Sequence, residues 1–398
     1  MNVLIALEHR FDRTPDGDVW TQTQFPYSFW QRYLEVFDHV QVVARIRDVP
    51  TVSSDCKEAN GDGVSFTAIP YYIGPVQYLW RSLQIKRTAQ QAVRPEDAVI
   101  LRVGSIIASC IEPKLRAINH PYAVEVVGDP YDVFAPGSIR HPLRSFFRWW
   151  SPRKLRQQCA RACASAYVTK HTLQTRYPCP NYSAGISDVD ISDEFLALTP
   201  RQFNKVGTLN LLFVGSLAQL YKAPDILINA VAICVQEGID LKLTMVGDGK
   251  HRSELEAQVA ALGLKERVCF RGQLTAGDAV RAELDQADLF ILPSKSEGLP
   301  RAMVEAMARA LPCIGSRVGG IPELLTDEDM VAPGNVDALA SKIREVVTNP
   351  ERMARMSARN LEKAKEYRDE LLRDQRIAFY RHVRQQTEAW LLQHFPVL

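Results

Sequence analysis

Glu297 and Glu305 lie in one segment, PSKSEGLPRAMVEAMARA (293–310), where their carboxylates could bind a ligand. The run before this segment, 288–292, is short and apolar, which predicts a buried strand that ends at the following proline. Pro300 suits the first position of a helix, and the residues after it are rich in alanine, methionine and glutamate. We therefore expect a strand, a loop that holds Glu297, and a helix that holds Glu305.

This order of elements would place a site for an anion next to a site for hydroxyl groups. The free N–H groups of Gly298 and Leu299 would join the positive end of the helix dipole, where a phosphate is stabilised. Glu305, one turn into the helix, could accept hydrogen bonds from two neighbouring hydroxyls. Phosphates at a helix start and a ribose diol on a carboxylate are the contacts that a sugar nucleotide needs. The alternative is that the glutamates are solvated charges on a helix surface.

The residues around the two glutamates resemble a known signature. The run SEGLPRAMVEAMA (296–308) is similar, over nearly its whole length, to the signature of the retaining glycosyltransferases of family 4, also called glycosyl transferases group 1. The resemblance implies the GT-B fold, in which two doubly wound, Rossmann-like α/β domains face each other across an active-site cleft. It also implies that Glu297 is a catalytic residue near the donor sugar and that Glu305 holds the nucleotide ribose. The other residues of this run expected at the donor are Gly298, Leu299 and Pro300.

A second segment could bind the diphosphate of such a donor. The sequence LLFVGSLAQLYKAPD (211–225) predicts a strand, a loop that begins at Gly215, and a helix that starts near Pro224. Gly215 permits a close backbone approach, and Lys222 offers a positive charge. The run resembles the diphosphate loop of the same family, except that Ser216 stands where the family usually has arginine. We therefore expect Gly215, Ser216 and Lys222 at the donor diphosphate, with Lys222 as the main cation.

The elements around these segments predict two domains. A chain of 398 residues exceeds one hydrophobic core. Short apolar runs alternate with helical stretches in both halves, which is typical of parallel sheets covered by helices, with ligands beyond the carboxyl ends of the strands. A polar stretch near residue 195 predicts the linker, so we place the domains at 1–195 and 196–372. By resemblance to the GT-B family, a helix at 373–398 crosses back to the first domain; a simple capping helix is the alternative.

The first domain should supply the acceptor side of the site. Asp129 follows a predicted strand, where many relatives have a catalytic histidine, and its carboxylate could bind the donor sugar or orient an acceptor hydroxyl. It could equally be a turn-forming residue before Pro130. Gly17 lies in the region of a glycine-rich loop of the family, which contacts acceptor or donor. Two acidic clusters, at 16–18 and 327–329, have the composition of a metal site but not the position of one at a strand end. We therefore expect no metal and no other cofactor, in agreement with the resemblance.

The overall composition excludes several other classes of protein. With 46% hydrophobic and 24% charged residues the chain is typical of a soluble globular protein, and a net charge of +2 gives no general case for binding nucleic acid. The eight cysteines contain no Cys-x-x-Cys pair, so we expect packed, reduced thiols. The first residues lack the pattern of a signal peptide, and no run reaches the length of a membrane span. We therefore expect a cytoplasmic protein.

One segment of the first domain could contact a membrane. Residues 140–161 contain seven Lys or Arg and no acid, with four Phe or Trp among them. Cations beside exposed aromatic rings suit an anionic membrane surface that carries a lipid-linked acceptor. The alternative is a helix whose aromatic residues face the core and whose basic residues face water. Both interpretations stay open at the level of the sequence.

These patterns together predict an enzyme that moves a sugar from a nucleoside diphosphate sugar to a hydroxyl of a glycan or lipid-linked acceptor. By resemblance, the anomeric configuration is retained and the setting is the assembly of bacterial surface polysaccharide. One alternative is a sugar-nucleotide epimerase of the same fold, which would bind the same donor without an acceptor. Two further alternatives are a sugar-binding protein without catalysis and an inactive partner subunit, for which Ser216 is the only hint.

Overall fold

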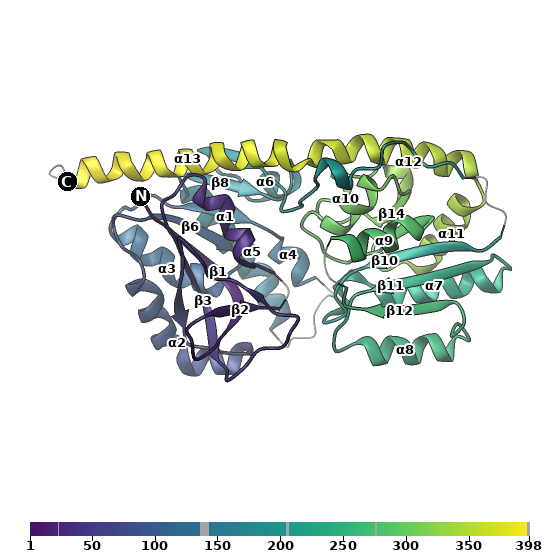
Figure 1. Ribbon diagram of the computed structural model, residues 1–398, viewed down its shortest axis with the longest axis horizontal. Coiled ribbons are helices and arrows are strands. Elements are labelled where there is room, and N and C mark those ends of the chain that lie inside the picture. Colours follow the sequence, from purple (N-terminus) through teal and green to yellow (C-terminus); the bar gives the residue numbers. More distant parts are fainter. Residues whose placement is uncertain (23, 136–142, 204–206, 275–276, 396–398) are drawn as a thin grey trace.

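The computed structural model describes residues 1–22, 24–135, 143–203, 207–274 and 277–395, and it contains two α/β domains side by side (Figure 1). In this part of the chain the first domain is built on a nine-stranded sheet and the second on a six-stranded sheet. The predicted class, two doubly wound α/β domains, is therefore confirmed.

The sheet of the first domain has parallel strands in the order β5-β3-β1-β6-β7-β8-β9. Strands β2 and β4 continue it at the end of β1 with antiparallel pairing. The strands are β1 (Val3–Arg13), β2 (Val19–Thr21), β3 (Val40–Asp48), β4 (Lys57–Glu58), β5 (Val64–Ile69), β6 (Ala98–Val103), β7 (Ala123–Val126), β8 (Ala164–Tyr167) and β9 (Tyr182–Gly185).

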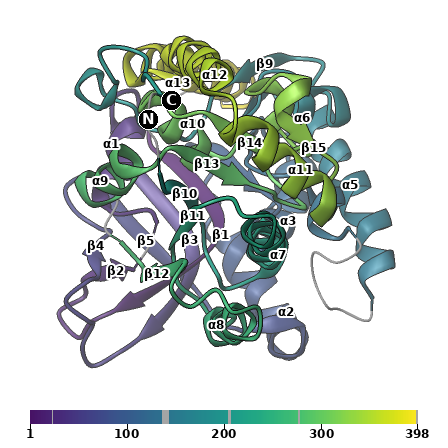
Figure 2. The ribbon, with the colours of Figure 1, turned by 90° about the vertical axis from the view of Figure 1, so that its right-hand side faces the viewer.

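Helices cover both faces of this sheet (Figure 2). One face carries α2 (Gly74–Gln91), α3 (Ile106–Ala117) and α5 (Arg144–Arg161), and the other carries α1 (Tyr27–Leu34) and α13 (Asp369–His394); the short helices are α4 (Pro130–Val133) and α6 (Thr172–Arg176). Successive side chains of a strand point to opposite faces, so Leu4 packs in the core under α2 and α3 while Val3 packs in the core under α1 and α13. A strand buried on both faces must be apolar throughout, which is why these runs are easy to recognise.

The sheet of the second domain is parallel throughout, in the order β12-β11-β10-β13-β14-β15. Its strands are β10 (Leu209–Val214), β11 (Leu241–Val246), β12 (Val268–Gly272), β13 (Leu289–Leu292), β14 (Cys313–Ser316) and β15 (Met330–Val331). Its helices are α7 (Pro224–Gln236), α8 (Arg252–Ala261), α9 (Asp278–Gln286), α10 (Arg301–Ala308), α11 (Val336–Val347) and α12 (Pro350–Ala364). The strand order reverses between β10 and β13, and the loops after such a switch point are where doubly wound sheets bind ligands.

The last helix joins the two domains. After α12, a 3-10 turn at Lys365–Tyr367 leads into α13, which runs back along the first domain (Figure 1). Phe379 and Tyr380 of α13 are buried in the core that also contains Trp30 and Tyr33 of α1. The chain therefore crosses between the domains twice, once after β9 and once at the start of α13.

The cysteines form no disulfide, and all eight are free. The expectation that they are packed is wrong for Cys269, which is exposed. This residue lies on β12, the edge strand of the second sheet, where alternate side chains face solvent. None of the described helices is long and apolar enough to span a membrane.

Candidate active site

The loops after β10 and β13 meet at the switch point of the second sheet. Lys222 ends the first loop and Glu297 lies in the second, and the Lys222 Nζ atom is 2.8 Å from Glu297 Oε1. The Ser294 hydroxyl donates a hydrogen bond of 2.7 Å to the same oxygen. The side chains are only 14% and 7% exposed. Burial disfavours the charged amine, but the carboxylate outweighs burial and raises the pKa of Lys222, so the amine stays protonated.

Glycines make this close arrangement possible. A Cβ atom at Gly215 would lie 2.4 Å from Lys222 Cδ, so a side chain there would displace the lysine. Gly247, at the end of β11, has φ +130°, and a Cβ there would lie 2.0 Å from the Gly215 carbonyl oxygen. Ser216 is exposed, and its hydroxyl accepts a hydrogen bond from the Ala218 N–H at 3.2 Å. Lys222 is therefore the cation of this loop.

The start of α10 follows directly after Glu297. Pro300 is the N-cap of α10, with φ −74° and ψ 104°, rather than its first helical residue as predicted. The backbone at Pro300 is extended, so the residues before it lie outside the helix at its N-terminal end. The N–H groups of Gly298 and Leu299 donate to no described residue. A Cβ at Gly298 would lie 2.5 Å from the Val127 carbonyl oxygen, so this glycine lets the two domains touch. A helix start with free N–H groups favours an anion, and this one lies between the domains.

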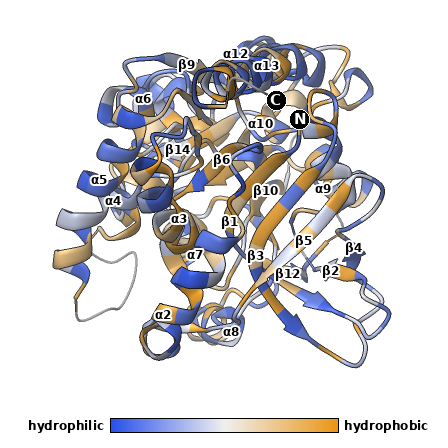
Figure 3. Cartoon of the chain, turned by 90° about the vertical axis from the view of Figure 1, so that its left-hand side faces the viewer, coloured by the Kyte–Doolittle hydropathy of each residue, from blue (hydrophilic) through white to orange (hydrophobic). Residues whose placement is uncertain are grey.

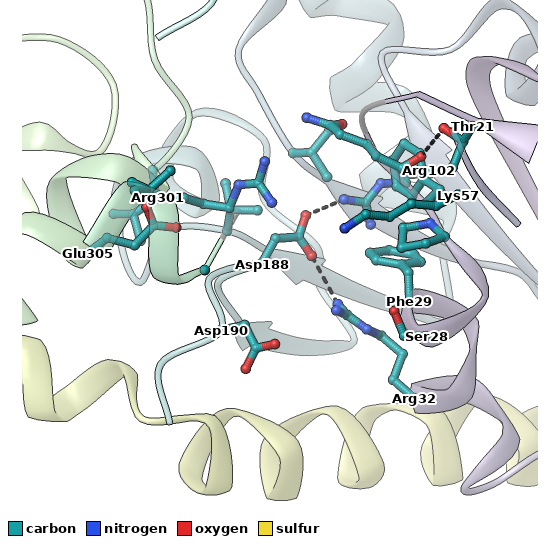
Figure 4. Close-up of a pocket in the computed structure, with 18 of the residues that line it drawn as sticks. Thr21, Ser28, Phe29, Arg32, Lys57, Arg102, Asp188, Asp190, Arg301 and Glu305 are labelled. Carbon is teal, nitrogen blue, oxygen red and sulfur yellow. Dashed lines mark hydrogen bonds and ion pairs between the residues drawn. The ribbon is translucent and has the colours of Figure 1, made fainter. Parts of the chain in front are cut away.

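A cavity of about 660 Å³ opens between the two domains beside this helix start (Figure 4). Leu299, Arg301 and Glu305 line it from the second domain. Burial raises the pKa of Glu305, the nearby Arg301 opposes that rise, and Asp190 adds to it. A half-buried carboxylate with few protein partners is an acceptor for ligand hydroxyls. Lys222 and Glu297 do not line this cavity, and Gly298 and Leu299 connect it to that ion pair.

A network of charges forms the opposite wall. The Arg102 guanidinium donates to Glu125 Oε2 at 2.6 Å. It also pairs with Asp188, which in turn lies 3.4 Å from Arg32 (Figure 4). Tyr33 donates its hydroxyl proton to Glu125 at 2.9 Å. Burial alone would raise the pKa of Asp188, but the two arginines hold it below its ordinary value. Each buried charge of this wall thus has a partner, which fixes its shape.

Aromatic rings and unpaired charges complete the wall. The Arg102 guanidinium carbon lies 5.4 Å from the ring centroids of both Phe25 and Phe29. Phe25 has φ +66°, a left-handed backbone that is costly for a residue with a side chain. Lys57 and Asp190 also line the cavity, and neither forms an ion pair with a described residue.

Most of the residues predicted for the donor lie together. Glu297 and Lys222 contact each other, Gly215 and Gly298 are the close backbone approaches beside them, and Leu299 and Glu305 line the cavity. The remaining members of the predicted set are Ser216, exposed on the first loop, and Pro300, the N-cap of α10.

The structure does not bring Asp129 to the cavity. It is 2% exposed and is the N-cap of α4, where it accepts a hydrogen bond from the Tyr131 N–H at 2.8 Å. Its carboxylate also pairs with Arg176 and accepts a hydrogen bond from the Tyr177 hydroxyl. The carboxylate predicted to bind the sugar or acceptor is therefore occupied by protein partners and has a structural role.

Gly17 is also outside the cavity. It lies in the turn between β1 and β2, with φ +97°, and the Gly17 N–H donates to the Thr14 carbonyl. Strand β1 continues to Arg13 because Phe11 is buried and the strand keeps its pairing with β3. The extension carries the turn to the tip of a hairpin, away from the site.

Sequence reasoning missed the charged residues that form the first-domain wall of the cavity, although two of them stand out in the sequence. Arg102 and Glu125 are single charges inside the apolar strands β6 and β7, and a charge at such a position requires a buried partner. Asp188 lies in the polar stretch that was assigned to the linker. Nothing in its local sequence indicates that it pairs with Arg102 and Arg32.

No group of three or more His, Cys, Asp or Glu side chains that could hold a metal ion occurs among the described residues.

The second domain and the fold both match known proteins. Residues 199–363 match the family model of the glycosyl transferases group 1. Protein CapJ of Staphylococcus aureus is 28% identical over 343 residues, which cover 85% of this chain and 85% of that protein. The 2-deoxystreptamine glucosyltransferase of Streptomyces kanamyceticus is 29% identical over 247 residues, which cover 59% of this chain and 63% of that protein.

Solved structures share the arrangement of both domains. HepE of Anabaena, in complex with UDP and glucose, has a TM-score of 0.61 at 16% identity, over 99% of this chain and 100% of that one. The sucrose-phosphate synthase of Thermosynechococcus elongatus has a TM-score of 0.64 at 15% identity, over the whole of both chains. The likeness to these structures shows the fold, and the family match and the relatives show the type of enzyme. The chain is a glycosyltransferase with the GT-B fold, and its residues 199–363 match the glycosyl transferases group 1.

Proposed function

We propose that this enzyme is a retaining transferase of family 4 that moves a hexosyl group from a nucleoside diphosphate sugar to a hydroxyl of a glycan or lipid-linked acceptor. The observation that carries the proposal is the position of Glu305, which lines the interdomain cavity directly beside the free N–H groups of Gly298 and Leu299. A ribose diol on the carboxylate would leave the diphosphate at the helix start.

The proposed reaction is a front-face displacement. The bond between the anomeric carbon and the diphosphate oxygen breaks, and the acceptor oxygen forms its bond to that carbon on the same face. The departing diphosphate oxygen takes the proton of the acceptor hydroxyl, so charge and atoms balance. In this proposal the helix start and Lys222 stabilise the leaving diphosphate, and Glu297, by resemblance to the family, acts near the oxocarbenium-like sugar. Lys222 and Glu297 pair with each other behind the cavity wall, so the proposal requires donor binding to open this pair. In this scheme no metal is required.

The relatives support a choice of donor and setting. HepE of Anabaena was solved with UDP and glucose, so UDP-hexoses are the first donors to test. Protein CapJ and the amylovoran biosynthesis glycosyltransferase AmsK of Erwinia amylovora are among the relatives. A role in bacterial surface polysaccharide synthesis, on the cytoplasmic side of the cell membrane, is our proposal for the setting.

Membrane contact through 140–161 is part of this proposal. Of that segment, 140–142 lie outside the described residues. In the rest, Phe146, Trp149 and Trp150 are 50%, 53% and 41% exposed, so these rings do not face the core. Exposed rings beside basic residues favour the interfacial interpretation of the segment.

The test is to incubate the enzyme with UDP-, GDP- and ADP-hexoses and a bacterial lipid extract, and to determine the anomeric configuration of the product by NMR. We expect retention from one donor and the same rate in EDTA. An inverted product would overturn the retaining mechanism, and loss of activity in EDTA would overturn the metal-free scheme. An epimer formed from donor alone would identify the epimerase alternative.

A further inference from the structure

Helix α2 exposes a stripe of large apolar side chains. Val76, Leu79, Trp80 and Leu83 are 66%, 67%, 87% and 72% exposed, and Ile73, just before the helix, is 54% exposed. The spacing of three, one and three positions places these residues on one side of the helix. The opposite side, with Ile85 and Ala89, is fully buried in the core. The stripe therefore faces solvent directly, and neither core packing nor a neighbouring helix explains it.

Single exposed apolar residues are ordinary on a protein surface, but a contiguous stripe of five marks a contact surface. Trp80 is the most exposed aromatic side chain of the described residues. Tryptophan is also a residue that membrane interfaces favour, because its ring is apolar and its N–H can bond to water or lipid headgroups.

The stripe and the exposed rings of α5 belong to the same layer of helices. Helix α3 lies between α2 and α5 on this face of the sheet (Figure 3). The Gln90 side chain of α2 donates a hydrogen bond of 3.1 Å to the Cys110 carbonyl of α3, and the Gln158 side chain of α5 donates one of 3.3 Å to Glu112 of α3. In both helices the exposed apolar residues lie at or before the tenth residue, toward the end of the helix that is nearer the carboxyl ends of the strands and hence the interdomain cleft.

The positive charge of α2 and α5 indicates what kind of partner this face would bind. Helix α2 has three Lys or Arg, α5 has six, and neither has Asp or Glu, although the whole chain has a net charge of only +2. Of these nine cations, only Arg161 forms an ion pair with a described residue. Apolar side chains that project from a surface with unpaired cations fit a bilayer that contains anionic lipid.

We propose that α2 and α5 form one docking surface, the α2–α5 surface (73–87 and 143–154), which binds an anionic lipid bilayer and inserts the α2 stripe. The inference deepens the proposed function, because docking on this face holds the cleft edge of the first domain at the bilayer, where a lipid-linked acceptor would lie.

The experiment is co-sedimentation of the full chain with vesicles of phosphatidylcholine alone and of phosphatidylcholine with phosphatidylglycerol. The test variant is Trp80→Ser with Leu83→Ser, and the matched control is Leu392→Ser, an exposed leucine on α13 on the other face of the sheet. Because all three side chains are exposed, thermal unfolding should be unchanged in every variant. We expect binding to the anionic vesicles only, a loss of at least about tenfold for the test variant, and no change for the control.

A second variant tests the charge. Arg87→Gln with Arg153→Gln should weaken binding to anionic vesicles by about 30-fold, and 1 M NaCl should do the same to the wild type. Equal binding to both kinds of vesicle, no binding to either, or an equal loss in the Leu392→Ser control would overturn the proposal. A chain that ignores vesicles but forms dimers that Trp80→Ser dissociates would show that the stripe binds a second copy instead.

The vesicle assay needs no turnover, so it separates this inference from the proposed function. Vesicle binding without release of any nucleoside diphosphate would leave the α2–α5 surface in place and contradict only the proposed reaction.

Discussion

Replacing Lys222 by methionine removes the cation from a buried ion pair and leaves the Glu297 carboxylate without it. At 2.8 Å and an effective dielectric constant of about 20, the attraction between the two charges is about 6 kcal/mol. Much of that attraction offsets the cost of taking both charges out of water. Removal of one partner of a buried pair costs about 3–5 kcal/mol, and the Ser294 hydroxyl keeps one hydrogen bond to Glu297. We therefore expect Lys222→Met to lower the free energy of unfolding by about 3 kcal/mol.

The assay must report on the second domain. All six tryptophans lie in the first domain or in α13, at positions 20, 30, 80, 149, 150 and 390, so their fluorescence follows the first domain. Urea unfolding of the second domain should therefore be followed by far-UV circular dichroism. Lys242→Met, at an exposed lysine of β11, is the matched control and should change the stability by less than about 0.5 kcal/mol.

A double variant separates the contribution of the ion pair to stability from that of the residues around it. Lys222→Met with Glu297→Gln removes both charges, so it should recover most of the lost stability. If Lys222→Met unfolds at the same urea concentration as Lys242→Met, the ion pair has no energetic role and the reasoning about this loop is refuted.

Three further variants test other parts of the site. Because Arg301 opposes the rise in the pKa of Glu305, Arg301→Gln should raise that pKa further. Donor binding needs the ionised carboxylate, so the acid limb of the pH profile of kcat/KM should move to higher pH. An acid limb that does not move would contradict this assignment. Gly247→Ala puts a Cβ against the Gly215 carbonyl at a positive φ and should cost more than about 2 kcal/mol by circular dichroism in urea, where a neutral result would contradict the close approach. Asp129→Ala removes a helix cap and a paired carboxylate, and should lower stability of the first domain by about 2 kcal/mol in tryptophan-monitored urea unfolding; a variant of wild-type stability that has lost kcat would instead restore the catalytic interpretation.

The elements and the donor side could be predicted because their signals are local. An apolar strand, a proline and a helix-forming run fix the position of Glu305 within a short stretch of chain. The same holds for Gly215 and Lys222, which follow one strand. Hydrophobic periodicity and turn-forming residues act over a few neighbouring positions, so the elements that they predict are found in the structure.

The first-domain side could not be predicted because its interactions join distant residues. Asp129 looked like a free carboxylate after a strand, and its partners Arg176 and Tyr177 lie far along the chain, on and next to α6. Asp188 pairs with Arg102 across most of the first domain. Which side chains meet across a cleft depends on packing, which one sequence does not record.

The measurement that tests the central claim most directly is release of nucleoside diphosphate from a panel of UDP, GDP and ADP sugars, with lipid extract as acceptor. It should be made for the wild type, for Glu305→Ala, and for Glu237→Ala as a control far from the cavity, on a surface pair with Arg344. The account predicts release from one donor that depends on the extract, is abolished by Glu305→Ala and is unchanged by the control. Equal release by the wild type and Glu305→Ala, or no release from any donor, would contradict it.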